Sequence, residues 1–117
     1  MFKGLVKVGL VSMLAVGSLS AASYTAYIGC KVGGGQIEQP AYTCIKSIKL
    51  NGRLNTTFRT SGIVMGPERM PLGEHFLLEV EGSESIFTKY VRIVDSNNKE
   101  VYYDEDNKRY KFFKIKN

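Results

Sequence analysis

The stretch that decides the fold lies at residues 75–116 and reads HFLLEVEGSESIFTKYVRIVDSNNKEVYYDEDNKRYKFFKIK. Within it, Phe76, Leu78 and Val80 occupy every second position, which is the period of a half-buried β-strand. β-branched and aromatic residues, which suit a pleated surface, dominate the segments that follow. The pattern predicts four successive strands, at residues 76–81, 86–95, 100–103 and 109–116. An antiparallel meander is the simplest arrangement of such strands.

Polar turns separate these strands. Ser96-Asn97-Asn98 favours a turn because asparagine tolerates positive φ, and serine and asparagine bond their own backbone. Residues 104–108, DEDNK, form a second polar segment that is rich in oxygen ligands. Its spacing differs from that of an EF-hand calcium loop. We therefore expect a solvated hairpin tip there and no metal site.

The N-terminal half predicts one strand and one hairpin. Apolar side chains alternate along residues 24–32, which places Cys30 on the inward face. Gly33-Gly34-Gly35 ends this strand and, with residues 36–40, reads as a flexible connector. Asn51-Gly52 lies between strand-like residues 43–50 and 53–58, the strongest short-range signal of a type I′ hairpin.

Residues 61–73 predict the longest irregular section of the chain. They contain Pro67, Pro71 and several glycines, which exclude a helix of any length. Nowhere downstream of residue 23 does a 3.6-residue apolar period persist. About seven short strands in one small domain, residues 23–117, predict an all-β fold, specifically a small antiparallel β-sandwich of the immunoglobulin-like kind. A small barrel is the alternative, and the sequence has no tryptophan to mark an antibody-type core.

Residues 1–22 have the three parts of a secretory signal peptide. Lys3 and Lys7 precede an uncharged, mostly apolar run, and Ser20-Ala21-Ala22 supplies small residues for cleavage after Ala22. A retained membrane anchor is the alternative, although a spanning helix needs about 20 predominantly apolar residues and several serines dilute this segment. We expect a periplasmic or secreted protein with no stable membrane insertion once the signal peptide is removed.

The two cysteines, Cys30 and Cys44, predict one intrachain disulfide. An exported chain meets oxidising conditions in which such a bridge persists. A domain of this size has a thin hydrophobic core. A bridge that closes a loop of about 15 residues contributes about 3 kcal/mol in the chain-entropy model.

Residues suited to catalysis are sparse. The single histidine, His75, stands beside Glu74 at the start of a strand, and strand neighbours point to opposite faces. No GxSxG, HExxH or dinucleotide-binding motif occurs. We therefore expect a protein that is not an enzyme, with no cofactor and no metal.

The last predicted strand interleaves basic and aromatic residues. Its basic side chains are Arg109, Lys111, Lys114 and Lys116. They would either protect a sheet edge from aggregation or contact a polyanion such as a glycan. Acidic residues at 74, 79, 81 and 84 would then face them. The neighbouring Phe112 and Phe113 predict a bulge or burial on both faces.

Tyr102 and Tyr103 complete the candidate binding residues. As neighbours on a strand they must point to opposite faces, so one ring faces away from the core. The interpretation that follows is an exported, non-catalytic protein-binding or structural module of the cell envelope. The alternatives are an inhibitor or effector presenting the loop at 33–40 or 62–73, and a polyanionic glycan-binding module. Export argues against a nucleic-acid target.

Overall fold

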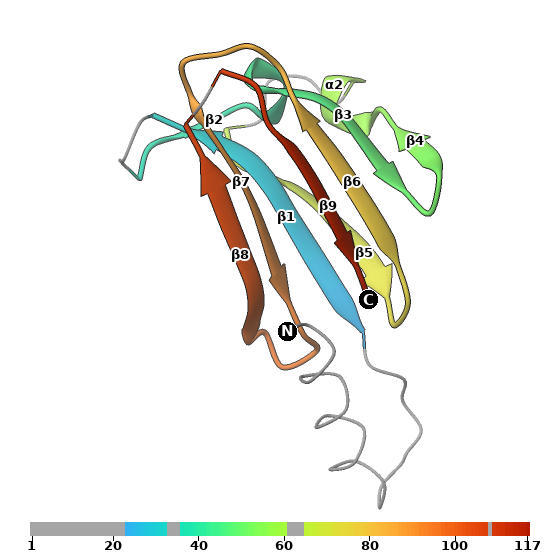
Figure 1. Cartoon of the computed structure of the whole chain (residues 1–117). Helices are drawn as coiled ribbons and strands as arrows, with labels where there is room; N and C mark the ends of the chain where they lie inside the picture. The colour runs from blue at the N-terminus through green and yellow to red at the C-terminus, as the bar shows by residue number, and fades with distance from the viewer. Residues whose placement is uncertain (1–22, 33–35, 61–64, 108) are drawn as a thin grey trace, which may run out of the picture.

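The structure is a computed structural model that describes residues 23–32, 36–60, 65–107 and 109–117. These residues form two antiparallel β-sheets that enclose the hydrophobic core (Figure 1). The all-β prediction and a sandwich-like arrangement are therefore confirmed. The segment predicted as a signal peptide lies outside the described residues, as does Gly33-Gly34-Gly35.

Sheet A has five strands, and sheet B has four. The strands of sheet A are β2 (Glu38–Gln39), β1 (Tyr24–Lys31), β7 (Thr88–Val94) and β8 (Glu100–Asp106) in spatial order, with β5 (Glu68–Gly73) also paired to β1. The strands of sheet B are β4 (Arg53–Asn55), β3 (Ile45–Leu50), β6 (Leu77–Gly82) and β9 (Phe112–Lys116). Two short helical turns are η2 (Ala41–Thr43) and α2 (Thr57–Thr60).

The core lies between the two sheets and follows the period of two most clearly along β1, β6 and β9. Tyr24, Ala26, Ile28 and Cys30 of β1 are all buried, so the predicted inward face of the first strand is confirmed. The core also contains Ile45, Ile48, Leu78, Val80, Val91, Ile93, Phe113 and Ile115. Both sheets therefore have one apolar face toward the core and one face toward solvent.

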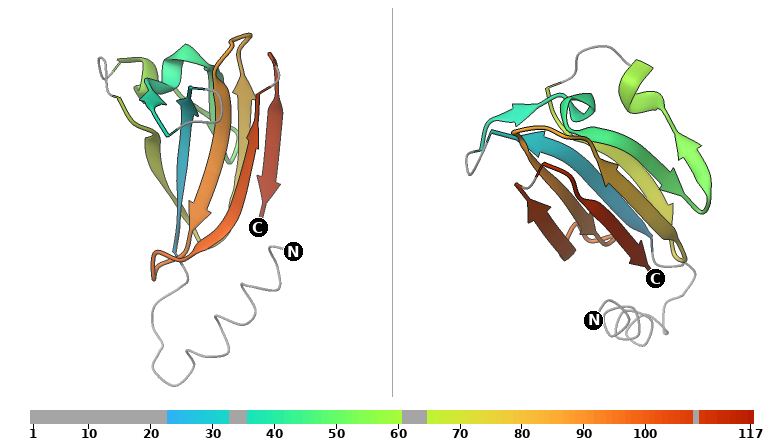
Figure 2. Two further views of the ribbon diagram at one scale, coloured as in Figure 1. Left: turned by 90° about the vertical axis from the view of Figure 1, so that its left-hand side faces the viewer. Right: turned by 45° about the horizontal axis from the view of Figure 1, so that its top comes forward.

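The strands of residues 75–116 do not form a meander. Strand β6 pairs with β3 and β9, whereas β7 pairs with β1 and β8. The chain therefore crosses from sheet B to sheet A after β6 and returns after β8 (Figure 2). Only β7 and β8 form a hairpin within this stretch. An alternating pattern indicates which face of a strand is buried but does not indicate which sheet the strand joins.

Strand β5 lies in the section predicted to be irregular. It contains Pro71 and pairs with β1. Because no described strand pairs with its other edge, the N–H that proline lacks is not needed for a second row of hydrogen bonds.

Two strands end at other residues than the sequence predicts. Strand β4 ends at Asn55, whose Oδ1 accepts hydrogen bonds from the backbone N and the hydroxyl of Thr57 at the start of α2. Strand β8 extends to Asp106, so residues 104–106 are strand and not turn.

Two predicted turns are confirmed. Asn51 and Gly52 have φ values of 53° and 84°, as a type I′ turn requires, and they join β3 to β4. In the turn after β7, Asn98 has a φ of 64°. Oδ1 of Asp95 accepts hydrogen bonds from the backbone N of Asn97 and of Lys99, which closes this turn.

Candidate functional site

The disulfide joins the two sheets. Cys30 in β1 of sheet A is bonded to Cys44, which immediately precedes β3 of sheet B, and their Cα atoms are 6.0 Å apart. The predicted bridge is confirmed, and the described residues contain no free cysteine. Because such bridges persist where conditions are oxidising, the bridge indicates a non-cytoplasmic environment.

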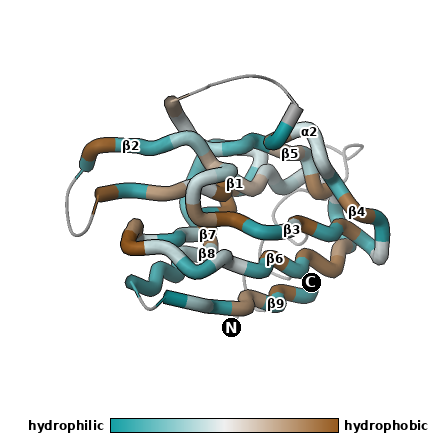
Figure 3. Tube along the Cα trace, turned by 90° about the horizontal axis from the view of Figure 1, so that it is seen from above, coloured by the Kyte–Doolittle hydropathy of each residue, from teal (hydrophilic) through white to brown (hydrophobic). Residues whose placement is uncertain are grey.

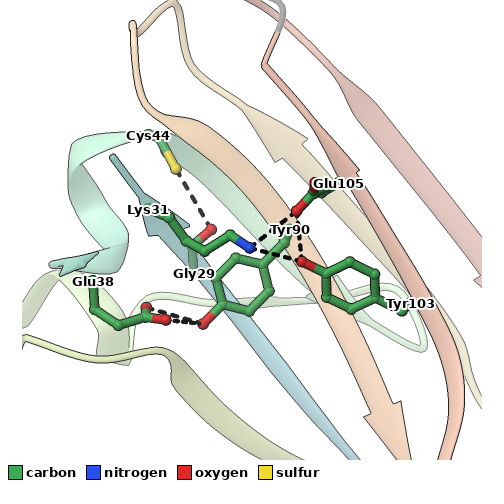
Figure 4. Close-up of polar contacts among 7 residues, drawn as sticks. All are labelled: Gly29, Lys31, Glu38, Cys44, Tyr90, Tyr103 and Glu105. Atoms are coloured by element: carbon green, nitrogen blue, oxygen red, sulfur yellow. Dashed lines mark hydrogen bonds and ion pairs between the residues drawn. The ribbon is translucent and has the colours of Figure 1, made fainter. Parts of the chain in front are cut away.

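A hollow of about 430 Å³ lies on the solvent face of sheet A. Strands β1, β2, β7 and β8 supply its side chains, which Figure 4 shows in part. We call it the tyrosine hollow, and its principal residues are Tyr27, Lys31, Glu38, Tyr90, Arg92 and Tyr103. Of these, only Tyr103 is among the binding residues predicted from the sequence.

Tyr90 forms the floor of the tyrosine hollow. Its side chain is buried but lies outside the main core, on the opposite face of the sheet. The hydroxyl group lies 2.9 Å from both carboxylate oxygens of Glu38 and donates to this group. Burial, reinforced by the hydrogen bond to Glu38, raises the pKa of Tyr90 well above the ordinary tyrosine value, so the phenol stays neutral. A Cβ at Gly29 would lie 3.0 Å from this hydroxyl, so glycine makes room for the ring.

Lys31 lies over two of the rings. Its Nζ is 5.3 Å from the ring centre of Tyr90 and 5.7 Å from that of Tyr103, within cation–π range. The same Nζ donates to the Tyr103 hydroxyl at 3.0 Å and pairs with Glu105 Oε1 at 3.0 Å. The Tyr103 hydroxyl donates to Glu105 at 2.6 Å. These contacts fix Lys31 and Tyr103 in one arrangement (Figure 4).

The contacts among Lys31, Tyr103 and Glu105 shift the pKa of each group. The hydrogen bond to Tyr103 raises the pKa of Lys31, and burial partly opposes that effect. The hydrogen bond from Tyr103 is also the largest cause that lowers the pKa of Glu105. Burial raises the pKa of Tyr103 itself. At neutral pH the cluster therefore holds an ammonium, a carboxylate and a neutral phenol.

A row of alternating arginine and tyrosine residues crosses the same face of sheet A. Arg69 in β5, Tyr27 in β1, Arg92 in β7 and Tyr103 in β8 are neighbours in the strand register. The Arg92 guanidinium lies 5.4 Å from the ring centre of Tyr27, and its Nε pairs with Glu100 at 3.0 Å. Tyrosine and arginine are the residues that dominate binding energy at many interfaces.

Apolar side chains are exposed at one end of the sandwich. Ile86 is 83% exposed and Ile37 is 63% exposed, and Val32 lies beside them. The backbone N of Val32 donates to the carbonyl of Ile37 at 3.0 Å, and Lys31 is the register partner of Thr88 just after Ile86. Figure 3 shows hydrophobic segments at the ends of β1 and β2 and ahead of β7 on the same side. We call Val32, Ile37 and Ile86 the apolar end.

The basic residues predicted near the C-terminus are separated from the tyrosine hollow. Strand β9 belongs to sheet B, where it pairs with β6 alone as an edge strand. Arg109 pairs with Glu84 at 3.2 Å, and Lys111 pairs with Asp106 at 3.6 Å and with Asp104 at 4.0 Å. Of the four acidic residues expected to face the basic ones, Glu84 pairs with Arg109, whereas the partners of Lys111 are the unexpected Asp104 and Asp106.

Lys114 and Lys116 point to solvent from the outer face of sheet B. Lys114 is the register partner of Glu79, while Phe113 and Ile115 point inward. The strand alternates regularly in its register with β6, so the predicted bulge at Phe112 and Phe113 is wrong: Phe112 is exposed and Phe113 is buried.

The two adjacent tyrosines of β8 point to opposite faces, as predicted. Tyr102 packs against the hydrophobic core, and Tyr103 is 40% exposed on the outer face. Burial raises the pKa of Tyr102, with a smaller contribution from Asp104. Tyr102 is therefore a core residue, and only Tyr103 of this pair contributes to a surface site.

Lys89 is an unexpected residue of the interior. Its side chain is fully buried between the sheets, on the core side of β7, where the strand register places it opposite Asp106. Its Nζ donates to the Phe87 carbonyl at 3.4 Å. Burial lowers its pKa, while the carboxylate of Asp106 opposes that shift. No pattern in the sequence predicts this burial, because lysine is rarely buried.

The described ranges hold neither a candidate metal site nor a candidate membrane-spanning helix. They contain no cluster of three or more metal-ligating side chains, and His75 is exposed, with its Nε2 3.9 Å from Glu74. No helix in these ranges has the length and apolar character to cross a membrane. Comparison of the chain with protein-family models, curated proteins and solved structures gave no match.

Proposed function

We propose that this chain is an exported, non-catalytic domain that binds another protein of the cell envelope or the extracellular space, or supports envelope structure. Residues 1–22 act as a cleavable signal peptide in this proposal, and residues 23–117 work in the periplasm or outside the cell. The charged start and apolar run of the sequence and the disulfide support export. The intact mass of the exported protein tests both points, because cleavage after Ala22 and loss of two hydrogens on oxidation each change it.

We also infer an immunoglobulin-like arrangement of the two sheets. The support is a disulfide that joins strands of opposite sheets, between β1 and the residue before β3. Tryptophan is absent, so the core differs from that of an antibody domain. An experimental structure with an order of strands incompatible with this class would remove the inference.

The observation that carries protein binding is the apolar end. Isoleucine is normally buried, yet Ile86 and Ile37 are exposed at the same end of the sandwich, one on each side of the end of β1. A group of exposed apolar side chains with a polar surround is typical of a protein interaction site.

Binding assays with a matched pair of variants test this proposal. The oxidised domain, residues 23–117, would be immobilised and exposed to envelope extract as wild type, as Ile86→Asp/Ile37→Asp and as Leu54→Asp. Leu54 is 59% exposed but lies in β4, away from the apolar end. We expect wild type and the Leu54 variant to retain the same protein from the extract. The double variant should fail to retain it. Equal retention by all three forms would reject the apolar end as the binding site.

An inhibitor or effector is the second candidate. The connector between β1 and β3 carries Ile37 and begins next to Cys30, so the disulfide restrains its base. Restraint of this kind lowers the entropy cost of binding. The inhibitor hypothesis is supported if the protein retained in the same assay is an enzyme and if its activity falls when the domain is added.

For the third candidate, polyanion binding, fewer of the predicted basic side chains are available than the sequence suggested. Arg109 and Lys111 have carboxylate partners, which leaves Lys114 and Lys116 directed to solvent. Replacing these two lysines by glutamine should reduce retention on heparin at low salt if a polyanion binds here. Unchanged retention would exclude this face as a polyanion site.

A further inference from the structure

The tyrosine hollow is a second surface feature, separate from the apolar end. Its volume of about 430 Å³ falls within the roughly 300–1,000 Å³ range of small-ligand sites. Its floor is built in a fixed position, because Tyr90 is buried, lies over Gly29 and is held by Glu38. A floor that is already ordered does not have to lose conformational entropy when a ligand binds.

The lining of the hollow carries charges of both signs, and Glu105 beside it pairs with Lys31 at 3.0 Å. Lys31 and Arg92 supply two positive charges, and Glu38 and Glu100 supply two negative charges. Arg92 and Glu100 pair directly at 3.0 Å. A ligand with net charge of either sign would meet like charge at close range. The lining therefore favours an uncharged ligand that carries many hydrogen-bonding groups.

Aromatic rings and charged polar groups alternate in the lining. Tyr27, Tyr90 and Tyr103 supply three rings, and the exposed part of Tyr103 forms one wall. The faces of such rings carry partial negative charge and attract the weakly positive C–H groups of a ligand. The carboxylates of Glu38 and Glu100 accept hydrogen bonds, and the guanidinium of Arg92 donates them. A sugar ring presents both features, since it has an apolar C–H face and an edge of hydroxyl groups that donate and accept.

The backbone of β1 and β7, which hold the floor of the hollow, is paired on both edges. Strand β1 pairs with β7 on one edge and with β2 and β5 on the other, and β7 pairs with β1 and β8. A peptide that binds by adding a strand needs a free sheet edge. Over β1 and β7 a ligand is therefore recognised by side chains, whereas β8, an edge strand of sheet A among the described strands, has its unpaired edge on the side away from β7.

We propose that the tyrosine hollow binds an uncharged sugar unit of a glycan. Tyr103 stacks on the C–H face of the sugar, and Glu38, Glu100 and Arg92 bond its hydroxyl groups. The hollow is open on the solvent side, so further units of the glycan extend away from the protein. This site does not depend on the apolar end, and a protein can occupy that end at the same time.

Titration of the oxidised, isotope-labelled domain with sugars tests the proposal by amide NMR. The probes are chitotriose, maltotriose and mannotriose, at concentrations up to about 20 mM, where a ligand with a Kd of about 1 mM saturates the site. We expect at least one probe to shift amide signals in β1, β7 and β8 around Tyr27, Tyr90 and Tyr103. Loss of one stacking ring in Tyr103→Ala should weaken that binding about three- to tenfold.

Two further variants separate recognition from folding. Tyr110→Ala removes an exposed tyrosine near sheet B, where its hydroxyl donates to Glu81, and should leave the affinity unchanged. Glu100→Gln keeps the size of a half-exposed side chain but alters the hydrogen-bonding set, and should weaken binding. Absence of shifts with all three sugars overturns the proposal. It is also overturned if the Tyr103 variant, with a dispersed amide spectrum, binds as wild type, or if the Tyr110 variant is weakened equally.

Discussion

The hydroxyl group of Tyr90 is held 2.9 Å from both carboxylate oxygens of Glu38, a residue 52 positions earlier in the chain. This contact fastens the short strand β2 and the connector that carries it to the central strand β7. A hydrogen bond to a charged group contributes about 1.5–3 kcal/mol when it is protected from water. The contact therefore links the stability of the connector to the floor of the tyrosine hollow.

Replacing Tyr90 by phenylalanine should lower the free energy of unfolding by about 1–2 kcal/mol, because the ring remains and only the bond to Glu38 is lost. Tyr27→Phe is the matched control. The Tyr27 hydroxyl accepts one long hydrogen bond, 3.4 Å, from Arg69 at the surface, so we expect a loss below about 0.5 kcal/mol. Urea denaturation measures both. Equal losses in the two variants would contradict the structural role of the Glu38 contact.

Stability should depend on acid pH through Glu105. Hydrogen bonding from Tyr103 lowers the pKa of Glu105 in the folded state, so the carboxylate stabilises the fold above the pKa of the unfolded chain. That contribution disappears as pH falls through the folded pKa, below about pH 4.3. Because Glu105 is about half exposed, the effect is at most about 1 kcal/mol.

Glu105→Gln provides the measurement for this pH dependence. The variant should be less stable than wild type at pH 7, and the difference should shrink as the pH approaches 3. Denaturation midpoints across that range test the expectation, with Glu84→Gln as an exposed control whose carboxylate pairs with Arg109 at the surface. A difference that stays constant with pH would show that Glu105 acts through packing and not through its charge.

Gly82 is required because Lys89 lies against it. A Cβ at Gly82 would be 2.7 Å from Cε of Lys89, closer still to its Cδ, and 3.3 Å from the Lys111 carbonyl. Gly82→Ala should therefore cost about 1–3 kcal/mol through overpacking. Gly66→Ala is the control, since nothing lies within 4 Å of a Cβ there. Thermal denaturation of both variants decides the point, and a neutral Gly82 variant would mean that Lys89 moves away at little cost.

The disulfide should contribute about 3 kcal/mol, as the chain-entropy model gives for a loop of about 15 residues. Urea denaturation of the oxidised domain and of Cys30→Ala/Cys44→Ala measures it. The two cysteines are fully buried, so part of any loss in the variant arises from the small cavities left by the sulfur atoms. Reduction of wild type separates these contributions, because it keeps both sulfur atoms. Unchanged stability after reduction would remove the bridge as a stabilising element.

Local sequence signals predicted the local structure well. Alternation along β1 placed Cys30 inward, Asn51-Gly52 marked the β3–β4 turn, and the pairing of two cysteines had only one intrachain solution. Each of these features depends on residues close in sequence or on a forced choice. The assignment of strands to sheets depends instead on non-local pairing, which alternation does not encode. The meander expected for residues 75–116 was wrong for this reason.

The tyrosine hollow illustrates the same limit. Lys31 and Tyr103 are 72 positions apart, yet their side chains share a hydrogen bond. The sequence showed that Lys31 and Tyr27 would face away from the core, and that one ring of Tyr102 and Tyr103 would do so. It did not show that β1 and β8 flank the same strand, β7. Without that adjacency the three tyrosines remain separate surface residues.

Lys89 is the residue whose environment conflicts most with its chemistry. Burial lowers its pKa, so the protonated form is less favourable in the folded state than in the unfolded chain. At pH values below the folded pKa, the unfolded state binds the proton more tightly and stability is reduced. Stability should therefore rise as the pH increases from the folded pKa toward about 10.4, the unfolded value.

Lys89→Met tests this account, because methionine fills a similar volume without a charge. Asp106 keeps Lys111 as a partner at 3.6 Å, so its carboxylate is not left alone by the substitution. We expect the free energy of unfolding at pH 7 to be unchanged or higher by about 1 kcal/mol. We also expect the rise in stability between the folded pKa of Lys89 and the unfolded value of about 10.4 to be absent. Urea denaturation at three pH values gives both quantities. A loss of about 3 kcal/mol at pH 7 would instead show that the Lys89 charge stabilises the fold through Asp106, because removing one partner of a buried pair has a cost of that size.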